Sequence, residues 1–291
     1  MAIALAKNYT DLLDEEFKKD SVTATLNGDM NFVKAGASAN EIYYPEVTTN
    51  GLGAYSRTEG YPDGSVALEW KHATFNYDRG TRILVDAMDD QETFNIAFGK
   101  AGQELQRTKV APEADAFTFA TLAGLTGVSK VSGAIASADA FLAALMTAAN
   151  TMDEDEVPSE DRVLFATASL INSLMGLETY KSQQILSTFS EVVKVPKSRF
   201  MDAIDLKSGR SDDSYIGGYA PGTDAKYLNF VIAHKPSLIK FDKHVASDLL
   251  APGQHTLSNG YVLMYRKYGI VDVYENQRKG VYVHVSETAA A

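Results

Sequence analysis

The chain has 291 residues, of which 45% are hydrophobic and 22% charged, and its 38 acidic and 27 basic residues give a formal net charge of −11. It contains no cysteine, which excludes disulfides, thiolate metal ligands and cysteine nucleophiles. The acidic balance argues against tight nucleic-acid binding, because phosphate contacts need a surplus of lysine and arginine.

No apolar run approaches the roughly 20 residues needed to span a bilayer, so we expect no membrane partner. The first ten residues are briefly apolar, but acidic residues follow without a signal-peptide cleavage pattern. Cytoplasmic synthesis is the simplest interpretation.

The first forty residues differ from a compact domain. Residues 8–19 predict a short acidic helix, and residues 21–40 are rich in Ser, Thr, Asn, Ala and Gly. We interpret this region as an arm that lies on the surfaces of other parts of the assembly, with a poorly ordered terminus as the alternative.

An extended region follows. Residues 41–47 predict a strand, which the segment 48–53 interrupts, and residues 54–77 predict two arms around a turn at 60–64. Arms of about ten residues reach roughly 30 Å. Because a two-stranded ribbon is marginal alone, it must lie on its own domain or on a neighbouring subunit.

The clearest helical pattern comes next. Residues 81–85 predict a strand, and apolar side chains then recur with helical spacing over residues 91–109. Pro112 is expected to break or kink this helix, with a second piece over 113–123 that stops at Gly124.

The second half mixes helices and strands. Residues 124–133 are a candidate domain boundary, and residues 207–226 predict a polar, glycine-rich loop. Helices are expected from Ser137 through Met152, from Thr167 through Met175 and over 178–193. Strands are expected at 162–166, 198–205, 227–233, 238–241, 261–268, 270–274 and 281–285. Since no regular strand–helix alternation is present, the predicted class is α+β.

Motifs for catalysis or cofactor binding are missing from the sequence. The five histidines lack the spacing of a zinc site, and no nucleophile elbow, phosphate-binding loop or dinucleotide fingerprint is present. We therefore predict no catalytic residue, cofactor or metal site.

Two acidic clusters have a structural interpretation. The run 153–156 lacks the alternate spacing of a calcium loop, so we favour a solvated connection. Asp86, Asp89 and Asp90 precede the long helix, where acids stabilise the positive end of the helix dipole. We favour this role over paired carboxylates for acid–base catalysis.

Tyrosines gather around the extended region, and tyrosine is enriched at protein interfaces. A sugar-binding surface is the alternative interpretation. The residues expected to contact another copy are Tyr55, Arg57, Glu59, Tyr61, Glu69, Trp70 and Lys71.

The order of these elements resembles the major capsid proteins of tailed bacteriophages, which have the Hong Kong 97-like capsid fold. The phrases that carry the resemblance are Tyr55-Ser56-Arg57-Thr58-Glu59-Gly60-Tyr61, Asp78-Arg79-Gly80-Thr81, Pro112-Glu113-Ala114-Asp115-Ala116, Phe241-Asp242-Lys243-His244 and Tyr265-Arg266-Lys267-Tyr268-Gly269. The resemblance covers almost the whole chain, and the order of the motifs is more specific than any one of them.

The resemblance implies an N-terminal arm (1–45), an extended loop hairpin (46–78) and a peripheral domain with a long spine helix (79–130). An axial domain (131–240) and C-terminal strands returning to both domains (241–291) would follow. The implied function is a non-enzymatic subunit that self-assembles into hexamers and pentamers of an icosahedral head. That head would be assembled in the host bacterial cytoplasm, and the virion would be the final location.

The implied partners are a portal protein, a separate scaffolding protein and packaged double-stranded DNA, enclosed but not read by sequence. The sequence lacks the long helical extension of a fused scaffold, so a cleaved scaffold piece is the alternative. Some relatives cross-link a loop lysine, but no partner for Lys71 is identified. The competing functions are an encapsulin-like nanocompartment shell and a soluble α+β carbohydrate-acting enzyme.

Overall fold

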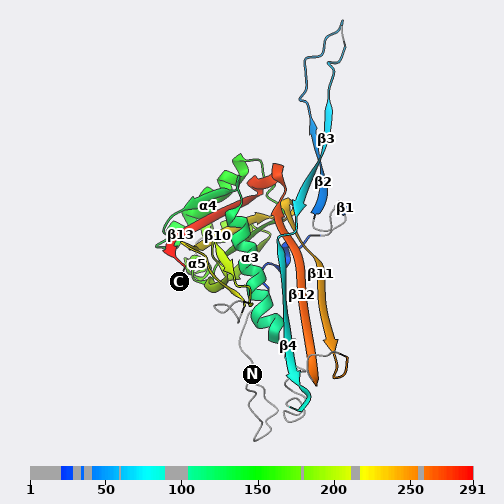
Figure 1. Ribbon diagram of the computed structural model, residues 1–291. Coiled ribbons are helices and arrows are strands. Elements are labelled where there is room, and N and C mark those ends of the chain that lie inside the picture. The colour runs from blue at the N-terminus through cyan, green and yellow to red at the C-terminus, as the bar shows by residue number, and fades with distance from the viewer. Residues whose placement is uncertain are drawn as a thin grey trace.

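The computed structural model describes residues 21–28, 34–35, 41–58, 60–88, 104–177, 180–210, 217–254 and 259–290. A central body carries a narrow ribbon that projects from one end and a long three-stranded sheet that extends the opposite way (Figure 1). Helices and strands are mixed along the chain, which confirms the α+β class.

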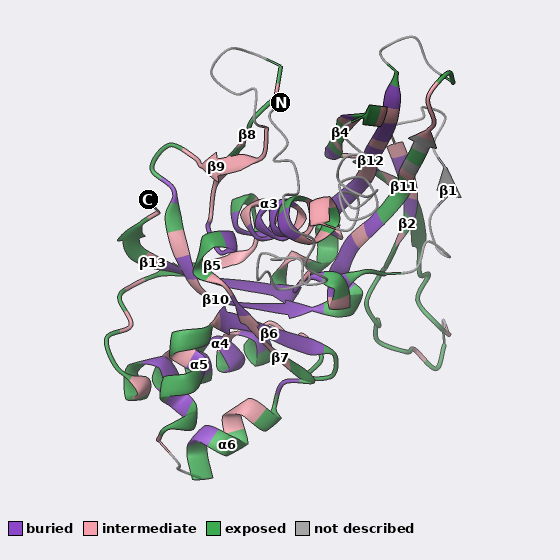
Figure 2. Cartoon of the chain, turned by 90° about the horizontal axis from the view of Figure 1, so that it is seen from below, coloured by how far each residue is buried: buried purple, intermediate pink, exposed green. Residues whose placement is uncertain are grey.

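The body is built on a five-stranded sheet in the order β5-β13-β10-β6-β7. Its strands are β5 (Ser129–Ser132), β6 (Arg162–Thr167), β7 (Glu191–Val195), β10 (Lys226–His234) and β13 (Val281–Ala289). The inner strands are buried on both faces and consist of near-continuous apolar residues (Figure 2).

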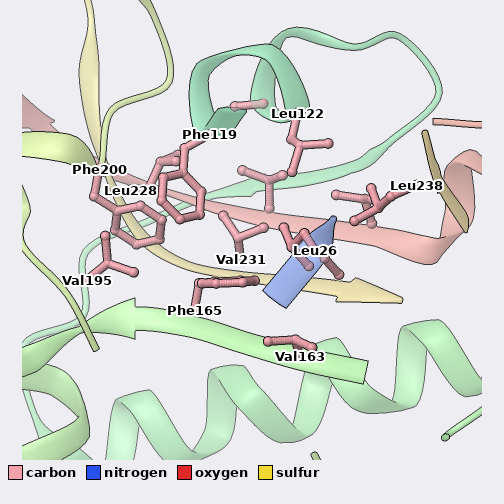
Figure 3. Packing of buried hydrophobic residues seen from close by; sticks show 14 of the residues in the cluster. Leu26, Phe119, Leu122, Val163, Phe165, Val195, Phe200, Leu228, Val231 and Leu238 are labelled. Carbon is pink, nitrogen blue, oxygen red and sulfur yellow. The ribbon is translucent and has the colours of Figure 1, made fainter. Parts of the chain in front are cut away.

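One face of this sheet packs against helix α3 (Ala111–Gly124). Phe119 of this helix meets Phe165 of β6 at 5.3 Å and Phe200 at 4.7 Å between ring centroids, both edge to face. Figure 3 shows the aromatic and aliphatic side chains of this core beneath the helix.

The other face is covered by α4 (Ala138–Glu154), α5 (Ala168–Met175) and α6 (Tyr180–Ser187). Phe141 of α4 meets Phe230 of β10 edge to face at 5.7 Å. Because successive side chains of a strand point to opposite faces, the inner strands contribute residues to two separate cores.

A second sheet, in the order β11-β12-β4, is antiparallel throughout. It consists of β4 (Tyr77–Asp86), β11 (Leu238–Leu250) and β12 (Gly260–Val273). The separate strands expected at 261–268 and 270–274 are one strand. Gly269 lies within this strand and is paired on both sides. A Cβ at this position would lie 2.7 Å from Asp242 Oδ1 and 3.0 Å from the Phe241 carbonyl oxygen. Glycine is used here for close strand approach.

The helix around Pro112 is not broken, which corrects the expected break, although its geometry is irregular just before the proline. A π-helical turn, η3 (Gln106–Val110), runs directly into α3, and Pro112 lies in the first turn of α3. Because the helix continues on both sides of Pro112, the proline removes one interior N–H donor, and the π-helical turn lies immediately before it. Helix α3 ends at Gly124, as predicted. Residues 91–103 of the expected long helix lie outside the described residues.

Two other expectations were wrong. The helix expected over 178–193 ends with α6, and its last residues begin strand β7, which runs parallel to β6. The strand expected over 198–205 is instead a 3-10 turn, η4 (Lys197–Arg199), followed by the short strand β8 (Ile204–Leu206).

Two segments expected to be irregular contain short strands. Strand β9 (Tyr219–Pro221) lies in the expected loop 207–226 and pairs with β8. The expected boundary 124–133 contains β5, which joins the central sheet beside β13.

Candidate assembly surface

The projecting ribbon consists of β2 (Glu41–Thr49) and β3 (Val66–Thr74), with the short strand β1 (Lys34–Ala35) beside the base of β2. The first arm is therefore residues 41–49, not a segment after residue 54 as expected. The connection is long, and the predicted turn at 60–64 lies within it. There Ser56 and Gly60 exchange backbone hydrogen bonds of 3.0 and 2.8 Å.

The ribbon has two chemically different faces. Paired residues in an antiparallel ladder share a face, and successive residues alternate between faces. The inner face contains the pairs Ile42–Ala73, Tyr44–Lys71, Glu46–Glu69 and Thr48–Ala67. The outer face contains the pairs Tyr43–His72, Pro45–Trp70, Val47–Leu68 and Thr49–Val66.

The base of the inner face belongs to the core of the chain itself. Ile42, Tyr44 and Ala73 are buried against the first residues of β11 and the end of β12. The Tyr44 ring meets Tyr274 edge to face at 4.9 Å, and burial raises the pKa of the Tyr44 phenol. This contact anchors the ribbon to the body.

Beyond the base, the inner face is charged. Lys71 Nζ lies 3.3 Å from Glu69 Oε2 and 3.6 Å from Glu275 Oε2. The hydrogen bond with Glu69, together with the charge of Glu275, raises the pKa of Lys71. Glu69 and Lys71, which were both expected to contact another copy, thus form an ion pair with each other. Lys71 also pairs with Glu275, which is distant in sequence.

The outer face is apolar and exposed. Val47 is 59% exposed, Leu68 56% and Trp70 46%. At the tip, the rings of Tyr55 and Tyr61 lie 5.0 Å apart, and Tyr61 is 86% exposed. A ribbon of two strands therefore presents a stripe of large apolar side chains to solvent.

Among the residues expected at an interface, Tyr55, Arg57, Tyr61, Glu69 and Trp70 are exposed, and Lys71 is half-buried. Glu59 lies outside the described residues. Sequence reasoning missed the aliphatic part of the stripe, which consists of Val47, Val66 and Leu68. The alternation from Val66 through Trp70 was the available signal, because every second residue there is large and apolar.

Histidines in the body have structural partners. His234 Nδ1 lies 2.7 Å from Ser237 Oγ, and His284 Nδ1 lies 3.0 Å from the Asn229 amide nitrogen. Burial lowers the pKa of both imidazoles. In the described part of the chain, no group of three or more His, Asp or Glu side chains has the geometry to hold a metal ion.

The acidic clusters also have identifiable partners. Asp153 accepts from the buried Arg162 at 2.7 Å, and Asp155 accepts from Lys279 at 3.1 Å. Asp86 ends strand β4 and is exposed, whereas Asp89 and Asp90 lie outside the described residues. None of the helices within the described ranges is long and apolar enough to cross a membrane.

Comparison with known proteins finds similarity in structure alone. No protein-family model matches the chain, and no curated protein matches its sequence. The structure from bacteriophage PhiM1 mature capsid has a TM-score of 0.65 at 12% identity, covering 97% of this chain and 92% of that one. The structure from Mycobacterium phage Che8 has a TM-score of 0.60 at 14% identity and covers 98% of both chains.

A further similar structure is the capsid of the cyanophage P-SCSP1u, with a TM-score of 0.61 at 13% identity, covering 98% of this chain and 93% of that one. A virus-like particle from Pyrococcus furiosus is also similar, with a TM-score of 0.51 at 9% identity, covering 82% of this chain and 86% of that one. The chain therefore has the fold of phage capsid proteins over almost its whole length.

Proposed function

We propose that this chain is the major capsid protein of a tailed bacteriophage, a structural subunit that forms hexamers and pentamers of an icosahedral head. The observation that carries the proposal is the exposed outer face of the ribbon, in a chain with the fold of phage capsid proteins. A surface of this kind suits binding to another copy.

Burial of the exposed apolar stripe would stabilise an assembly of subunits. Burying a large apolar side chain contributes about 1.5–3 kcal/mol relative to leaving it exposed. Within the described residues these side chains stay largely exposed, and a two-stranded ribbon is at best marginally stable alone. Clustered apolar exposure marks interaction sites more often than it marks ordinary surface. A partner that covers Val47, Leu68 and Trp70 would therefore be strongly favoured.

A second copy is the partner that best fits this geometry. Closed symmetric assemblies repeat one contact in every subunit. The stabilisation from a modest interface is therefore multiplied over the whole shell. The nine residues of β2 extend about 30 Å at 3.3 Å per residue. That reach suits a ribbon lying across a neighbouring subunit.

The phage head is favoured over a nanocompartment shell by the extent of the structural likeness. The phage capsid structures match 97–98% of the chain, whereas the Pyrococcus furiosus particle matches 82% with a lower TM-score. The formal charge of −11 suits a wall that encloses double-stranded DNA without gripping it. Terminase and portal genes beside this gene would support the phage, and a cargo-enzyme gene would support the nanocompartment.

Several finer expectations belong to the same proposal. They are the Hong Kong 97-like division into arm, extended loop, peripheral domain and axial domain, assembly in the host cytoplasm, and partnership with a portal and a separate scaffolding protein. The ribbon, the three-stranded sheet and the five-stranded sheet are separate sheets, which supports this division.

The test uses two neighbouring positions on opposite faces of β3. Leu68→Lys places a charge on the outer face, and Ala67→Lys places the same charge on the inner face, at an exposed position. We expect Leu68→Lys to reduce the yield of closed particles at least tenfold with an unchanged circular dichroism spectrum, and Ala67→Lys to assemble normally. Equal assembly of both variants, counted by electron microscopy, would refute the role of the outer face.

A further inference from the structure

The Pro112–Ala116 segment contains a fully buried acid, Asp115, that no assembly contact explains. Its side chain has no exposed surface, although it lies in a helix otherwise packed on an apolar core. A buried carboxylate is costly unless its oxygens are hydrogen-bonded and its charge is compensated. The partners of Asp115 therefore indicate what the acid does.

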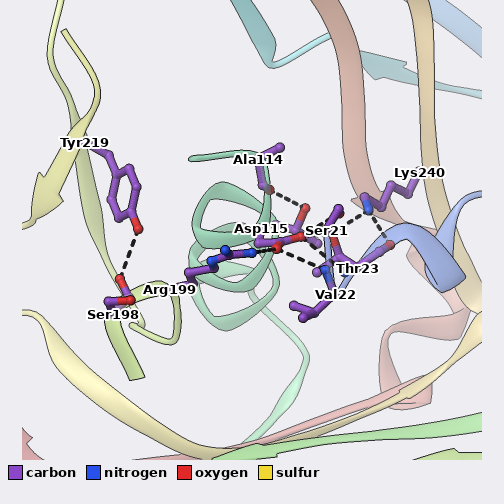
Figure 4. A network of polar contacts seen from close by, with 10 residues as sticks. Ser21, Val22, Thr23, Ala114, Asp115, Ser198, Arg199, Tyr219 and Lys240 are labelled. Carbon is purple, nitrogen blue, oxygen red and sulfur yellow. Dashed lines mark hydrogen bonds and ion pairs between the residues drawn. The ribbon is translucent and has the colours of Figure 1, made fainter. Parts of the chain in front are cut away.

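Most of these partners come from the N-terminal segment, residues 21–28. Asp115 Oδ1 accepts from Ser21 Oγ at 2.7 Å, from Thr23 Oγ1 at 2.7 Å and from Thr23 N–H at 3.1 Å. Oδ2 accepts from Val22 N–H at 3.0 Å. Figure 4 shows these groups converging on the carboxylate from one side of α3. Three consecutive residues are thus held by one side chain.

The segment is fixed at two further points. Val22 and Leu26 insert into the apolar core beneath α3. Lys240 Nζ donates to the Thr23 carbonyl at 2.6 Å, and Gly28 N–H donates to the Lys240 carbonyl at 2.9 Å. The segment therefore lies between α3 and strand β11, and it covers Asp115.

The remaining partner comes from elsewhere in the body. Arg199, at the end of η4, donates from Nη1 to Asp115 Oδ2 at 2.9 Å, and its side chain is buried. The turn η4 follows strand β7 at the edge of the central sheet. One carboxylate thus joins the N-terminal segment, helix α3 and the edge of the central sheet.

We propose that Asp115 is a coupling point, through which the position of Arg199 controls whether the N-terminal segment stays attached to the body. Withdrawal of the guanidinium leaves the buried carboxylate without its directly bonded cation, and the Lys240 ammonium, which is bonded to Thr23, is then the nearby positive charge. The carboxylate regains water most easily when residues 21–23, which cover it, move away. Movement of the turn η4 thereby releases the N-terminal segment, residues 21–28, from the body.

A neighbouring acid shows the same design and supports the interpretation. Glu113 accepts from Arg79 Nε of β4 at 2.6 Å, and Arg79 also donates to the carbonyls of Lys207 and Gly218 at 2.9 and 3.2 Å. The acids at positions 113 and 115 therefore tie separate segments to the first turns of α3. This accounts for both acidic positions of the Pro-Glu-x-Asp-Ala phrase.

The test is amide hydrogen exchange on the dissociated subunit, so its result does not depend on shell formation. Arg199→Met removes the cation and keeps an apolar stem, and Arg199→Lys keeps the charge. Arg162→Met is the matched control, because Arg162 is also buried and paired with an aspartate, away from the N-terminal segment. We expect Arg199→Met to speed exchange at Val22 and Thr23 at least tenfold, Arg199→Lys to restore most of the protection, and Arg162→Met to leave both amides unchanged.

Reciprocity supplies a second arm if Arg199→Met fails to fold. Coupling between two sites acts equally in both directions. Thr23→Val, which removes one donor to Asp115 and conserves volume, should speed exchange of the Arg199 and Phe200 amides, whose acceptors are Pro196 and Lys197. Protection that is lost only beside each substitution, or lost equally throughout the chain, would overturn the proposal.

Discussion

Trp70 lies directly opposite Pro45 in the ribbon, on the face turned away from Tyr44 and the core beneath it. The pair continues an apolar stripe towards Val47 and Leu68, whereas the other face has Glu46 opposite Glu69 at the same level. One ribbon is therefore anchored by its own chain through one face and left exposed on the other.

The tip of the ribbon can be removed without disturbing its base. We propose replacing residues 51–64 with Asn-Gly, since Asn50 and Ser65 are already hydrogen-bonded at 3.2 Å and this dipeptide favours a two-residue hairpin turn. We expect a folded subunit with an unchanged thermal transition and few closed shells, measured by calorimetry and particle counting. Normal shells would show that the tip is dispensable, and loss of folding would assign it to the subunit's own core.

Lys240 should make stability depend on pH in the alkaline range. Burial lowers its pKa to about 8, whereas an unfolded lysine titrates near 10.4. Between these values the unfolded chain binds more protons, so the free energy of unfolding should rise with pH. The limit is about 1.4 kcal/mol per pH unit, and we expect less because Lys240 retains some solvent contact.

Urea unfolding of the dissociated subunit between pH 8 and pH 10 would measure this slope. Above that range, buried tyrosines such as Tyr77, whose pKa is raised by burial and by Glu113, contribute an opposite slope. Lys240→Met should flatten the profile. An identical slope in both proteins would show that another group is responsible.

Phe119 should be among the most sensitive core positions. Its ring contacts two other aromatic rings and is fully buried. We expect Phe119→Ala to lower the free energy of unfolding by about 3–5 kcal/mol. Met175→Ala, at a residue that is 52% exposed, should change it by no more than about 0.5 kcal/mol. Comparable losses in the two variants would contradict the packing described for α3.

The start of α4 offers a smaller and cleaner test. Ser137 Oγ accepts from Ala140 N–H at 3.1 Å. Ser137→Ala should cost about 1 kcal/mol, and Ser137→Asp should retain the stability because aspartate caps equally well. Ser173→Ala, at an exposed position of α5, is the control. Chemical denaturation monitored by circular dichroism would separate the three variants.

Elements defined by local signals were predictable from the sequence. The cap at Ser137 predicted the first turn of α4, and the apolar run from Val163 to Ala166 predicted β6. Gly124 correctly marked the end of α3. In each case the residues that determine the element lie within it or next to it, so a short window contains the information.

Pairings between distant segments were not predictable in the same way. The first arm of the ribbon was misplaced because Thr49 pairs with Val66 across a long connection that holds no local signal for register. The ion pair between Lys71 and Glu275 was not predicted, because Glu275 lies about two hundred residues further along the chain. Residues 191–193 of strand β7 were predicted as helix because their strand conformation depends on pairing with β6.

The contacts of Asp115 also constrain the order in which the protein can be completed during translation. Its partners Ser21 and Thr23 precede it by 94 and 92 residues, and Arg199 follows it by 84. Residues 21–23 leave the ribosome first and have no acceptor until α3 is made. Asp115 in turn has no cation until η4 has emerged. Since domains fold as units while the chain is synthesised, we expect the N-terminal segment to attach late, although it is made among the first.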